Sequence, residues 1–284
     1  MPQASQSSNF PLTANVMPLS KIMILRYILS LILLVSTTGC SNIYSRLTYD
    51  FEELSSSINI LYEIGAEDLA MYTDENLEDI FSEVEAQQYL QFKAPEEIKV
   101  ILFNDKGRYS NYSSASMRTR GSATTNDIYI SPIIRERIET FRSVLKHELS
   151  HIHIRQYIGT WSYVRDIPGW FLEGLAVESS GGAGAENVST EEAIKFIKAG
   201  KYFSPRTEGG FLRHNSAHDY GLKPHMYYRQ AGLFVRYLKE LDNDSFKRSY
   251  IGLTKGESFG IVWKMHYGKN LEELWEGFIE KLQA

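Results

Sequence analysis

Cysteine is nearly absent from this chain: one residue, Cys40, occurs among 284. A chain with one cysteine forms no internal disulfide, so its fold depends on an apolar core. Hydrophobic residues make up 43% of the sequence, which is ample for such a core. The net charge of −5 is mild and no basic cluster occurs, so we expect no nucleic-acid partner. Internal repeats are also lacking, which favours one ordinary globular unit.

A hydrophobic run long enough to cross a membrane is missing too. The apolar stretch 22–35 has about 14 residues, short of the roughly 20 that span a bilayer. Lys21 precedes it, and small residues follow it as far as Gly39 and Cys40, a sequence typical of a secretory signal peptide. We therefore predict a signal peptide over residues 1–40.

The end of this segment resembles a bacterial lipobox, in which the cysteine is lipidated and becomes the new N-terminus. The resemblance implies that Cys40 is lipidated and anchors the protein to a membrane of the bacterial cell envelope, facing the periplasm. Thr37 stands where such boxes usually have leucine. The alternatives are an uncleaved anchor and a chance cysteine.

Two histidines four residues apart mark the middle of the sequence. The stretch 147–151 reads His-Glu-Leu-Ser-His, and on an α-helix residues i and i+4 share one face. Two imidazoles so placed can bind one metal ion, and zinc accepts imidazole nitrogen readily. Glu148 lies about 100° around the helix from His147, within reach of a water on the metal without being a ligand. The pattern therefore predicts zinc ligands at His147 and His151 and a catalytic base at Glu148.

The sequence around this motif is helical in pattern. Apolar residues recur at helical spacing from about Glu136 to Ile158, and Gly159 is a suitable end. A second helix is predicted after Pro168, and small residues beside Glu173 would let it lie close to the first. Glu173 is then the natural third ligand of a His₂Glu zinc site with an open position.

A third histidine at the metzincin spacing is lacking. That pattern, H-E-x-x-H-x-x-G-x-x-H, needs glycine and histidine where this chain has Ile154 and Tyr157. His153 lies on a different face of the helix from His151, so we interpret it as an ordinary polar or packing residue.

The segments H-E-L-S-H and W-F-L-E-G-L-A-V-E together resemble the gluzincin branch of zinc metallopeptidases. They resemble most the bacterial peptidase MA-like domains, and the resemblance covers roughly Ile98 to the C-terminus. It implies the same three zinc ligands, with Glu148 as general base.

A later segment, residues 228–232, reads Tyr-Arg-Gln-Ala-Gly and is similar to the Tyr-x-Lys-Gly-Ala segment of aminopeptidase N-like enzymes. The resemblance implies that Tyr228 is catalytic and stabilises the oxyanion. His225 or Tyr227 could take this role instead, and a further alternative is that Tyr228 only packs in the core. The G-x-M-E-N segment that binds the substrate amino terminus in those aminopeptidases is missing. The nearest stretch, 121–126, lacks the methionine and the glutamate, so aminopeptidase activity is not expected.

The remaining patterns divide the chain into the signal peptide, a helical lead-in over 41–93, and a peptidase domain over 94–284. We expect helices around 49–62 and 77–90 in the lead-in, because apolar residues recur there at helical spacing. In the peptidase domain the patterns predict strands at 98–103 and 127–130, a surface loop at 109–121, and helices at 190–198, 227–241 and 271–282.

Three further segments bear on the cleft. Thr124–Ile130 is our candidate for its upper edge strand, and a plain structural strand is the alternative. Residues 160–166 are expected to connect the two zinc helices. Asp166 or Glu178 could orient a ligand histidine, or be solvated surface carboxylates. The glycine-rich run 181–185 lacks a Lys-Ser/Thr pair, so we interpret it as a rim of the cleft rather than a phosphate loop.

Together these patterns predict an α+β fold, and the resemblance implies that it is of the zincin type. A small mixed β-sheet packs on the metal-binding helix, and a helical C-terminal subdomain completes the site. The predicted function is zinc-dependent hydrolysis of a peptide bond in a peptide or protein substrate. The alternative is a catalytically inactive zinc-binding scaffold or a peptide-binding lipoprotein. The intact Glu148 favours catalysis, because a structural zinc site needs no base.

Overall fold

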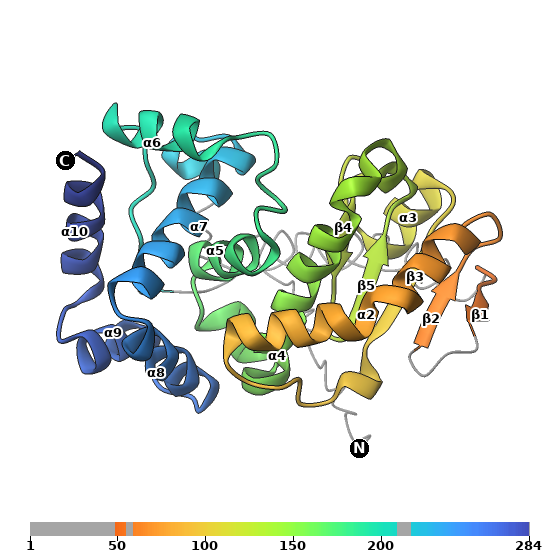
Figure 1. Ribbon diagram of the computed structural model, residues 1–284, viewed down its shortest axis with the longest axis horizontal. Coiled ribbons are helices and arrows are strands. Elements are labelled where there is room, and N and C mark those ends of the chain that lie inside the picture. The colour runs from red at the N-terminus through yellow and green to blue at the C-terminus, as the bar shows by residue number, and fades with distance from the viewer. Residues whose placement is uncertain (1–48, 55–58, 209–216, 284) are drawn as a thin grey trace, which may run out of the picture. The chain divides into compact units, whose positions relative to one another are not determined.

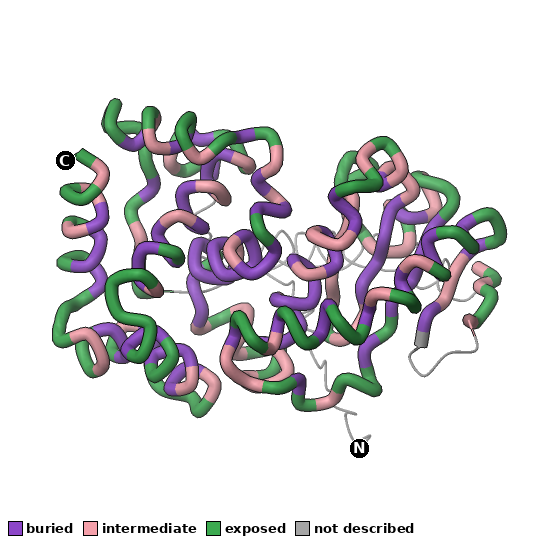
Figure 2. Tube along the Cα trace, in the orientation of Figure 1, coloured by how far each residue is buried: buried purple, intermediate pink, exposed green. Residues whose placement is uncertain are grey.

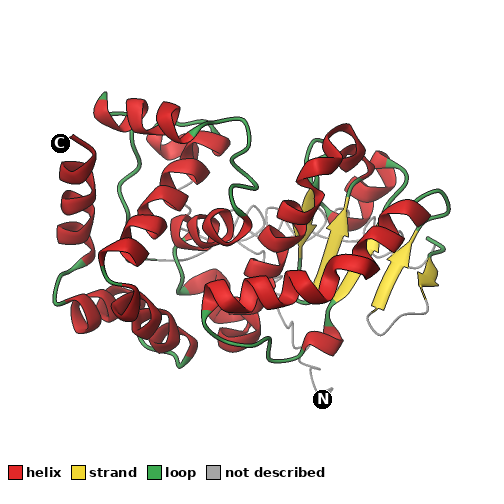
Figure 3. Cartoon of the chain, in the orientation of Figure 1, coloured by secondary structure: helices red, strands yellow, loops and turns green. Residues whose placement is uncertain are grey.

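The computed structural model describes residues 49–54, 59–208 and 217–283. The signal peptide expected over 1–40 and the candidate lipidation site Cys40 lie outside the described residues. Asp50–Ala284 forms one compact unit. Figure 3 shows the strands together at one end of this unit, whereas the other end is helical. None of the helices in the described ranges is long and apolar enough to span a bilayer.

Five short strands form one mixed sheet, and the three central strands run parallel. An antiparallel strand pairs with each side of these three. Buried apolar residues fill β3 and β5, as expected for parallel strands covered on both faces. The strands follow the spatial order β1 (Glu52–Leu54), β2 (Asn59–Tyr62), β3 (Lys99–Leu102), β5 (Asp127–Ile130) and β4 (Gly121–Ala123) (Figure 1).

The prediction of a helix around residues 49–62 is wrong, because this part of the chain supplies β1 and β2. Ile60 pairs in register with Val100 of β3 and is fully buried. The apolar residues there fit a helical period only weakly. Pairing with a buried strand removes more apolar surface from water than an isolated helix would, so the tertiary pairing decides the structure.

α2 (Glu67–Gln88) confirms the second helix expected in this region, although it begins earlier than residue 77. Its buried face carries Leu69, Leu77, Ile80 and Val84, at the spacing of one side of a helix. This face joins the sheet and the next long helix in one apolar core.

α3 (Lys106–Ser113) forms where a surface loop was expected over 109–121. The Asp105 side chain caps it by accepting a hydrogen bond from the Arg108 backbone N–H. Tyr109 is the one residue of α3 that is buried. A single buried residue gives no repeating apolar pattern, so the sequence does not predict this helix.

α4 (Phe141–Arg165) carries the two histidines of the motif. A 3₁₀ segment, η2 (Pro132–Thr140), precedes it, so the helix begins later than the sequence pattern indicates. At Gly159 the backbone leaves the helical region, with φ +78° and ψ 156°. The break expected at Gly159 is confirmed, but residues 160–165, expected as a connector, continue as a helix.

The rest of the described chain is helical and surrounds a second core rich in aromatic residues. The helices expected at 190–198, 227–241 and 271–282 are confirmed as α6, α7 and α10, and α8 and α9 are additional. The bounds are α5 (Gly169–Ser180), α6 (Thr190–Lys198), α7 (Pro224–Leu241), α8 (Asn243–Thr254), α9 (Phe259–Tyr267) and α10 (Leu271–Gln283), with short 3₁₀ turns η1 (Pro95–Glu97) and η4 (Ala217–Tyr220).

α5 is buried along almost its whole length, between α4 and α7 (Figure 2). Two glycines let α5 and α7 approach closely. A Cβ atom on Gly174 would lie 2.7 Å from the Ala231 carbonyl oxygen, and one on Gly232 would lie 2.6 Å from Val177. The predicted α+β class is confirmed, with the mixed sheet beside the histidine-bearing helix and a helical C-terminal half.

Candidate metal centre

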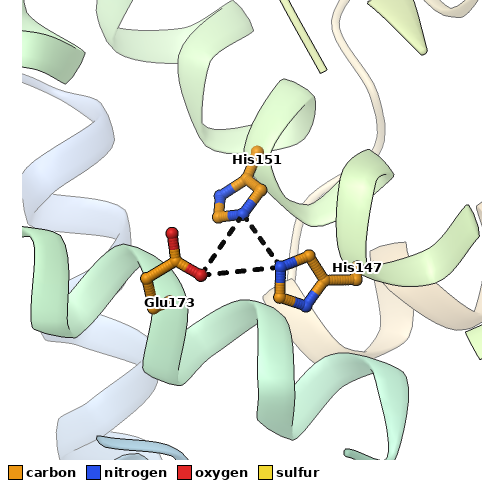
Figure 4. Close-up of side chains that lie close together, drawn as sticks. All are labelled: His147, His151 and Glu173. Atoms are coloured by element: carbon orange, nitrogen blue, oxygen red, sulfur yellow. Dashed lines mark hydrogen bonds and ion pairs between the residues drawn. The ribbon is translucent and has the colours of Figure 1, made fainter. Parts of the chain in front are cut away.

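His147, His151 and Glu173 converge from two helices on one point (Figure 4). The Nε2 atoms of the two histidines are 3.2 Å apart, because the residues lie one turn apart on α4. The Glu173 carboxylate reaches them from α5, with Oε2 at 3.6 Å from His147 and 3.9 Å from His151. The circle through these three atoms has a radius of about 2.1 Å, within the roughly 2.0–2.2 Å of zinc–nitrogen and zinc–carboxylate bonds. The spacing of the three donor atoms therefore suits a zinc ion.

The three candidate ligands lie on helix segments that pack into different cores of the molecule. The stretch of α4 around His147 and His151 packs through Leu145, Leu149 and Ile152 into the core that includes the sheet. Glu173 is carried by α5, whose apolar residues belong to the aromatic core. The site is thus built at the contact between α4 and α5.

The charges of the site are set by burial and by the convergence itself. Burial lowers the pKa of His151 to about 3 against the opposing charge of Glu173, so this imidazole is neutral at pH 7. Burial raises the pKa of Glu173, but the interactions with His147, whose own pKa is raised, and with His151 outweigh burial, so the pKa of Glu173 is lowered. A neutral imidazole and an ionised carboxylate are the forms that bind metals.

Glu148 is buried beside this cluster and is not one of its three members. Burial, reinforced by the negative charge of Glu173, raises the pKa of Glu148 to about 7, against the opposing charges of His147 and Arg155. A carboxylate with a pKa near 7 can take up and release a proton at neutral pH.

Tyr163 holds the second histidine in place. Its hydroxyl lies 3.0 Å from His151 Nδ1, so it can accept that N–H while Nε2 faces the other ligands. Residues twelve apart in a straight helix would lie about 18 Å apart along its axis. The contact therefore depends on the break at Gly159, which turns the chain back toward His151. The role of Tyr163 was not predicted, and the signal available in the sequence was an aromatic residue shortly after a glycine within a helical pattern.

The two carboxylates suggested as orienting groups lie elsewhere. Asp166 pairs with Arg165 at 2.6 Å on the surface, and Glu178 accepts from Arg236 at 3.0 Å. His147 is enclosed instead by Gly184, where a Cβ atom would lie 2.8 Å from the ring carbon Cε1. The glycine-rich run after α5 thus packs against the His147 ring and lines the cleft.

His153 is fully buried and takes no part in the cluster, in line with its interpretation as a packing residue. Its Nδ1 lies 2.9 Å from the Tyr250 hydroxyl, and its Nε2 lies 2.9 Å from the Leu90 carbonyl oxygen. Burial lowers the pKa of His153 to about 4, against the effect of that carbonyl. The ring is therefore neutral and ties α4 to α8 and to the end of α2.

A cleft of about 550 Å³ opens from the ligands and Glu148. Its edge strand is β4, not the Thr124–Ile130 segment, because β5 lies between β3 and β4. The chain turns after Ala123, and the Thr124 N–H donates to the Asp127 carbonyl, so β4 is left outermost. Gly121 permits its close approach to α4, since a Cβ atom there would lie 2.7 Å from Val144.

The structure separates the three candidates for an oxyanion donor. Tyr228 and His225, on the first turns of α7, both line the cleft. The charge of Glu173 and burial raise the pKa of Tyr228 well above 10, so its hydroxyl keeps its proton. Tyr227 is buried and packs against Phe203 and Tyr220 in the aromatic core. Position thus favours Tyr228 or His225 over Tyr227.

No protein-family model matches the chain, and no curated protein matches it. Among solved structures, the chain is similar to yeast LTA4 hydrolase in complex with Bestatin, with a TM-score of 0.47 and 13% sequence identity. The match covers 83% of this chain and 37% of that one, so the chain spans little more than a third of its length.

Proposed function

We propose that this protein is a zinc-dependent hydrolase of peptide bonds, of the gluzincin type that its sequence resembles. The observation that carries the proposal is the set of His147, His151 and Glu173 on a circle of zinc-bond radius, with Glu148 beside it. A structural zinc site is normally closed by four protein ligands, whereas three ligands and an open cleft suit a catalytic one.

Zn²⁺ bound there would polarise a carbonyl group and lower the pKa of water to about 7. The chain's own residues supply the remaining chemistry. Glu148 takes the proton from the attacking water and later delivers it to the leaving amine, and its pKa of about 7 suits both steps. The protonated hydroxyl of Tyr228 donates a hydrogen bond to the oxyanion that develops on the substrate.

The edge strand β4 supports a peptide as the substrate. One side of β4 pairs with β5, and its residues also line the cleft. An extended peptide can add to such an edge through main-chain hydrogen bonds, which hold the scissile carbonyl near the metal ligands.

Digestion of a peptide library with and without a chelator tests the function. We expect cleavage that the chelator abolishes and zinc restores. Glu148→Gln should keep about one zinc per chain yet lose at least two orders of magnitude in rate, because it removes proton transfer and no ligand. A variant that cleaves at the wild-type rate would refute Glu148 as the base, and zinc binding without cleavage by the wild type would favour a scaffold.

We also propose that the enzyme is anchored in the bacterial envelope by lipid on Cys40, facing the periplasm. The support is the Gly39-Cys40 end of the signal-like segment in the sequence. Cys40→Ser should block processing or release the protein from membranes. An intact mass of the membrane form that includes Met1 would contradict the proposal.

A further inference from the structure

Arg155 continues the face of α4 that carries both histidines. It follows His151 by four residues, which corresponds to about 6 Å along the helix. Its side chain lines the same cleft as the ligands and Glu148. A permanent cation therefore stands in the cleft, about one helical turn beyond the metal centre.

The guanidinium of Arg155 is held from two sides. Its Cζ atom lies 4.1 Å from the centroid of the Tyr163 ring, and a terminal nitrogen donates to the backbone carbonyl of Thr124, just after β4. The Nε atom is buried and has no hydrogen-bond partner among the described residues. A stacked arginine that is already immobilised suits an anion, to which the remaining terminal nitrogen can donate a charge-assisted hydrogen bond.

Arg155 also has no carboxylate partner in the described part of the chain. Two other partly covered arginines do have one, since Arg142 contacts Glu83 at 2.5 Å and Arg120 lies 3.9 Å from Glu186. Arg229 instead donates to the backbone carbonyls of Val188 and Ala185. A partly buried charge is costly unless it is paired. An unpaired one that lines a cleft is typical of a site where the ligand completes the pair.

On the strand side of the cleft, the first acidic residue after β4 is Asp127, and its carboxylate accepts a hydrogen bond from the Tyr129 hydroxyl. The stretch 121–126 includes Thr124, whose carbonyl contacts Arg155, and it contains neither aspartate nor glutamate. A substrate amino group would meet a cation here, whereas a carboxylate would meet its complement.

We propose that Arg155 binds a carboxylate of the substrate, so that the enzyme prefers acidic peptides. The proposal rests on the peptidase function proposed above. The carboxylate lies about two residues from the cleaved bond, because an extended chain advances about 3.3 Å per residue. An Asp or Glu side chain and a C-terminal carboxylate share this chemistry, and the experiment distinguishes them.

The test uses matched peptides and two readouts. The zinc-loaded full chain digests positional peptide libraries with Glu or Gln fixed at each position, each made as the C-terminal acid and as the amide. The Kd of the same peptides, fluorescently labelled, is measured by anisotropy on the Glu148→Gln protein. We expect at least a tenfold preference for one carboxylate over its amide in both readouts, as for a charge-assisted hydrogen bond. Dependence on Glu against Gln assigns a side chain, and dependence on acid against amide assigns the C-terminus.

The arginine variants complete the test. Arg155→Gln should abolish the preference, because it removes the charge. Arg155→Lys should keep part of the preference, and it remains a usable test if Arg155→Gln does not fold. Arg165→Gln is the matched control, since Arg165 is exposed on the same helix and pairs with Asp166. If Arg155→Gln lowers cleavage and binding equally for all peptides, the proposal is overturned. Such a result would mean that Arg155 only stabilises the structure of the site and does not bind the substrate carboxylate.

The failures of the two proposals are distinguishable. Equal cleavage and equal binding of acid and amide peptides by the wild type would overturn the role of Arg155 and leave the peptidase function standing. Selective binding of the acidic peptides without any cleavage would keep the role of Arg155 and reject the peptidase function.

Discussion

At the scale of single residues, the short motif 147–151 and Glu173 contain most of what the sequence could predict about the site. Helical spacing alone places the two histidines together, since it depends only on local structure. Tyr163 and Arg155 were not predicted, because the contact of Tyr163 with His151 depends on a chain reversal and the pairing state of Arg155 depends on its tertiary neighbours.

The hydroxyl of Tyr163 gives a prediction about zinc affinity. Tyr163→Phe keeps the ring beneath Arg155 but removes the acceptor from His151 Nδ1. Loss of such an outer partner typically weakens zinc binding 10- to 100-fold, measured by competition with a chelating dye. Tyr157→Phe is the control, because the Tyr157 hydroxyl bonds the Gln91 carbonyl away from the cleft. Equal zinc affinity in the two variants would contradict the role of Tyr163.

Tyr228 and Tyr227 form a natural pair for testing the oxyanion donor. Tyr228→Phe should lower kcat by roughly 10²–10³-fold, or about 3 kcal/mol, with little change in KM and zinc content. Tyr227→Phe should keep kcat near wild type, because this ring packs in the aromatic core. If Tyr228→Phe retains full kcat while His225→Ala loses it, the donor is His225.

At the scale of elements, the sequence predicted long periodic segments better than short pairings. α2, α6, α7 and α10 have clear apolar faces, and their existence was predictable. β1, β2 and β4 have three or four residues each, which is too short to show a clear period. The place of β2 also depends on β3, which is distant in sequence. The edge of the cleft was therefore assigned one strand too far along the chain.

The break in α4 is the element on which the site's support depends. Gly159 has φ +78° and ψ 156°, a region that residues with a Cβ avoid at a cost of order 1–3 kcal/mol. Gly159→Ala should lower the free energy of unfolding by that amount and also weaken zinc binding, since Tyr163 would shift. Gly256→Ala is the control, because Gly256 also has positive φ, at +88°, but lies outside the cleft lining. Gly256→Ala should lower the stability measured in urea without weakening zinc binding. If both variants lose the same zinc affinity, the break at Gly159 has no specific role in supporting the site.

At the scale of the whole molecule, the buried His153 gives a dependence of stability on pH. Its pKa is about 4 when folded and 6.5 when exposed, so the unfolded chain binds the proton first as pH falls. Stability is complete above pH 6.5 and declines toward pH 4, by about 3 kcal/mol at most for this group.

Urea unfolding of the metal-free protein at pH 7 and pH 4.5 measures this effect. The loss of stability between the two should be smaller in His153→Gln than in wild type. His218→Gln, at an exposed position, should lose as much as wild type. If His153→Gln loses as much stability between pH 7 and pH 4.5 as the wild type does, other groups account for the pH dependence.

The ligands' origin in two cores has a consequence for how the protein melts. α4 presents its histidines from the core around the sheet, and α5 presents its glutamate from the aromatic core. Without a metal, the carboxylate and imidazoles contribute only a partly buried ion pair across this boundary. A shared ion adds a bond to each side, so neither core can loosen without losing the binding energy of the whole site. With the proposed zinc ion bound, the two cores would therefore unfold as one cooperative unit, and the ion would stabilise the contact between them as well as serve catalysis.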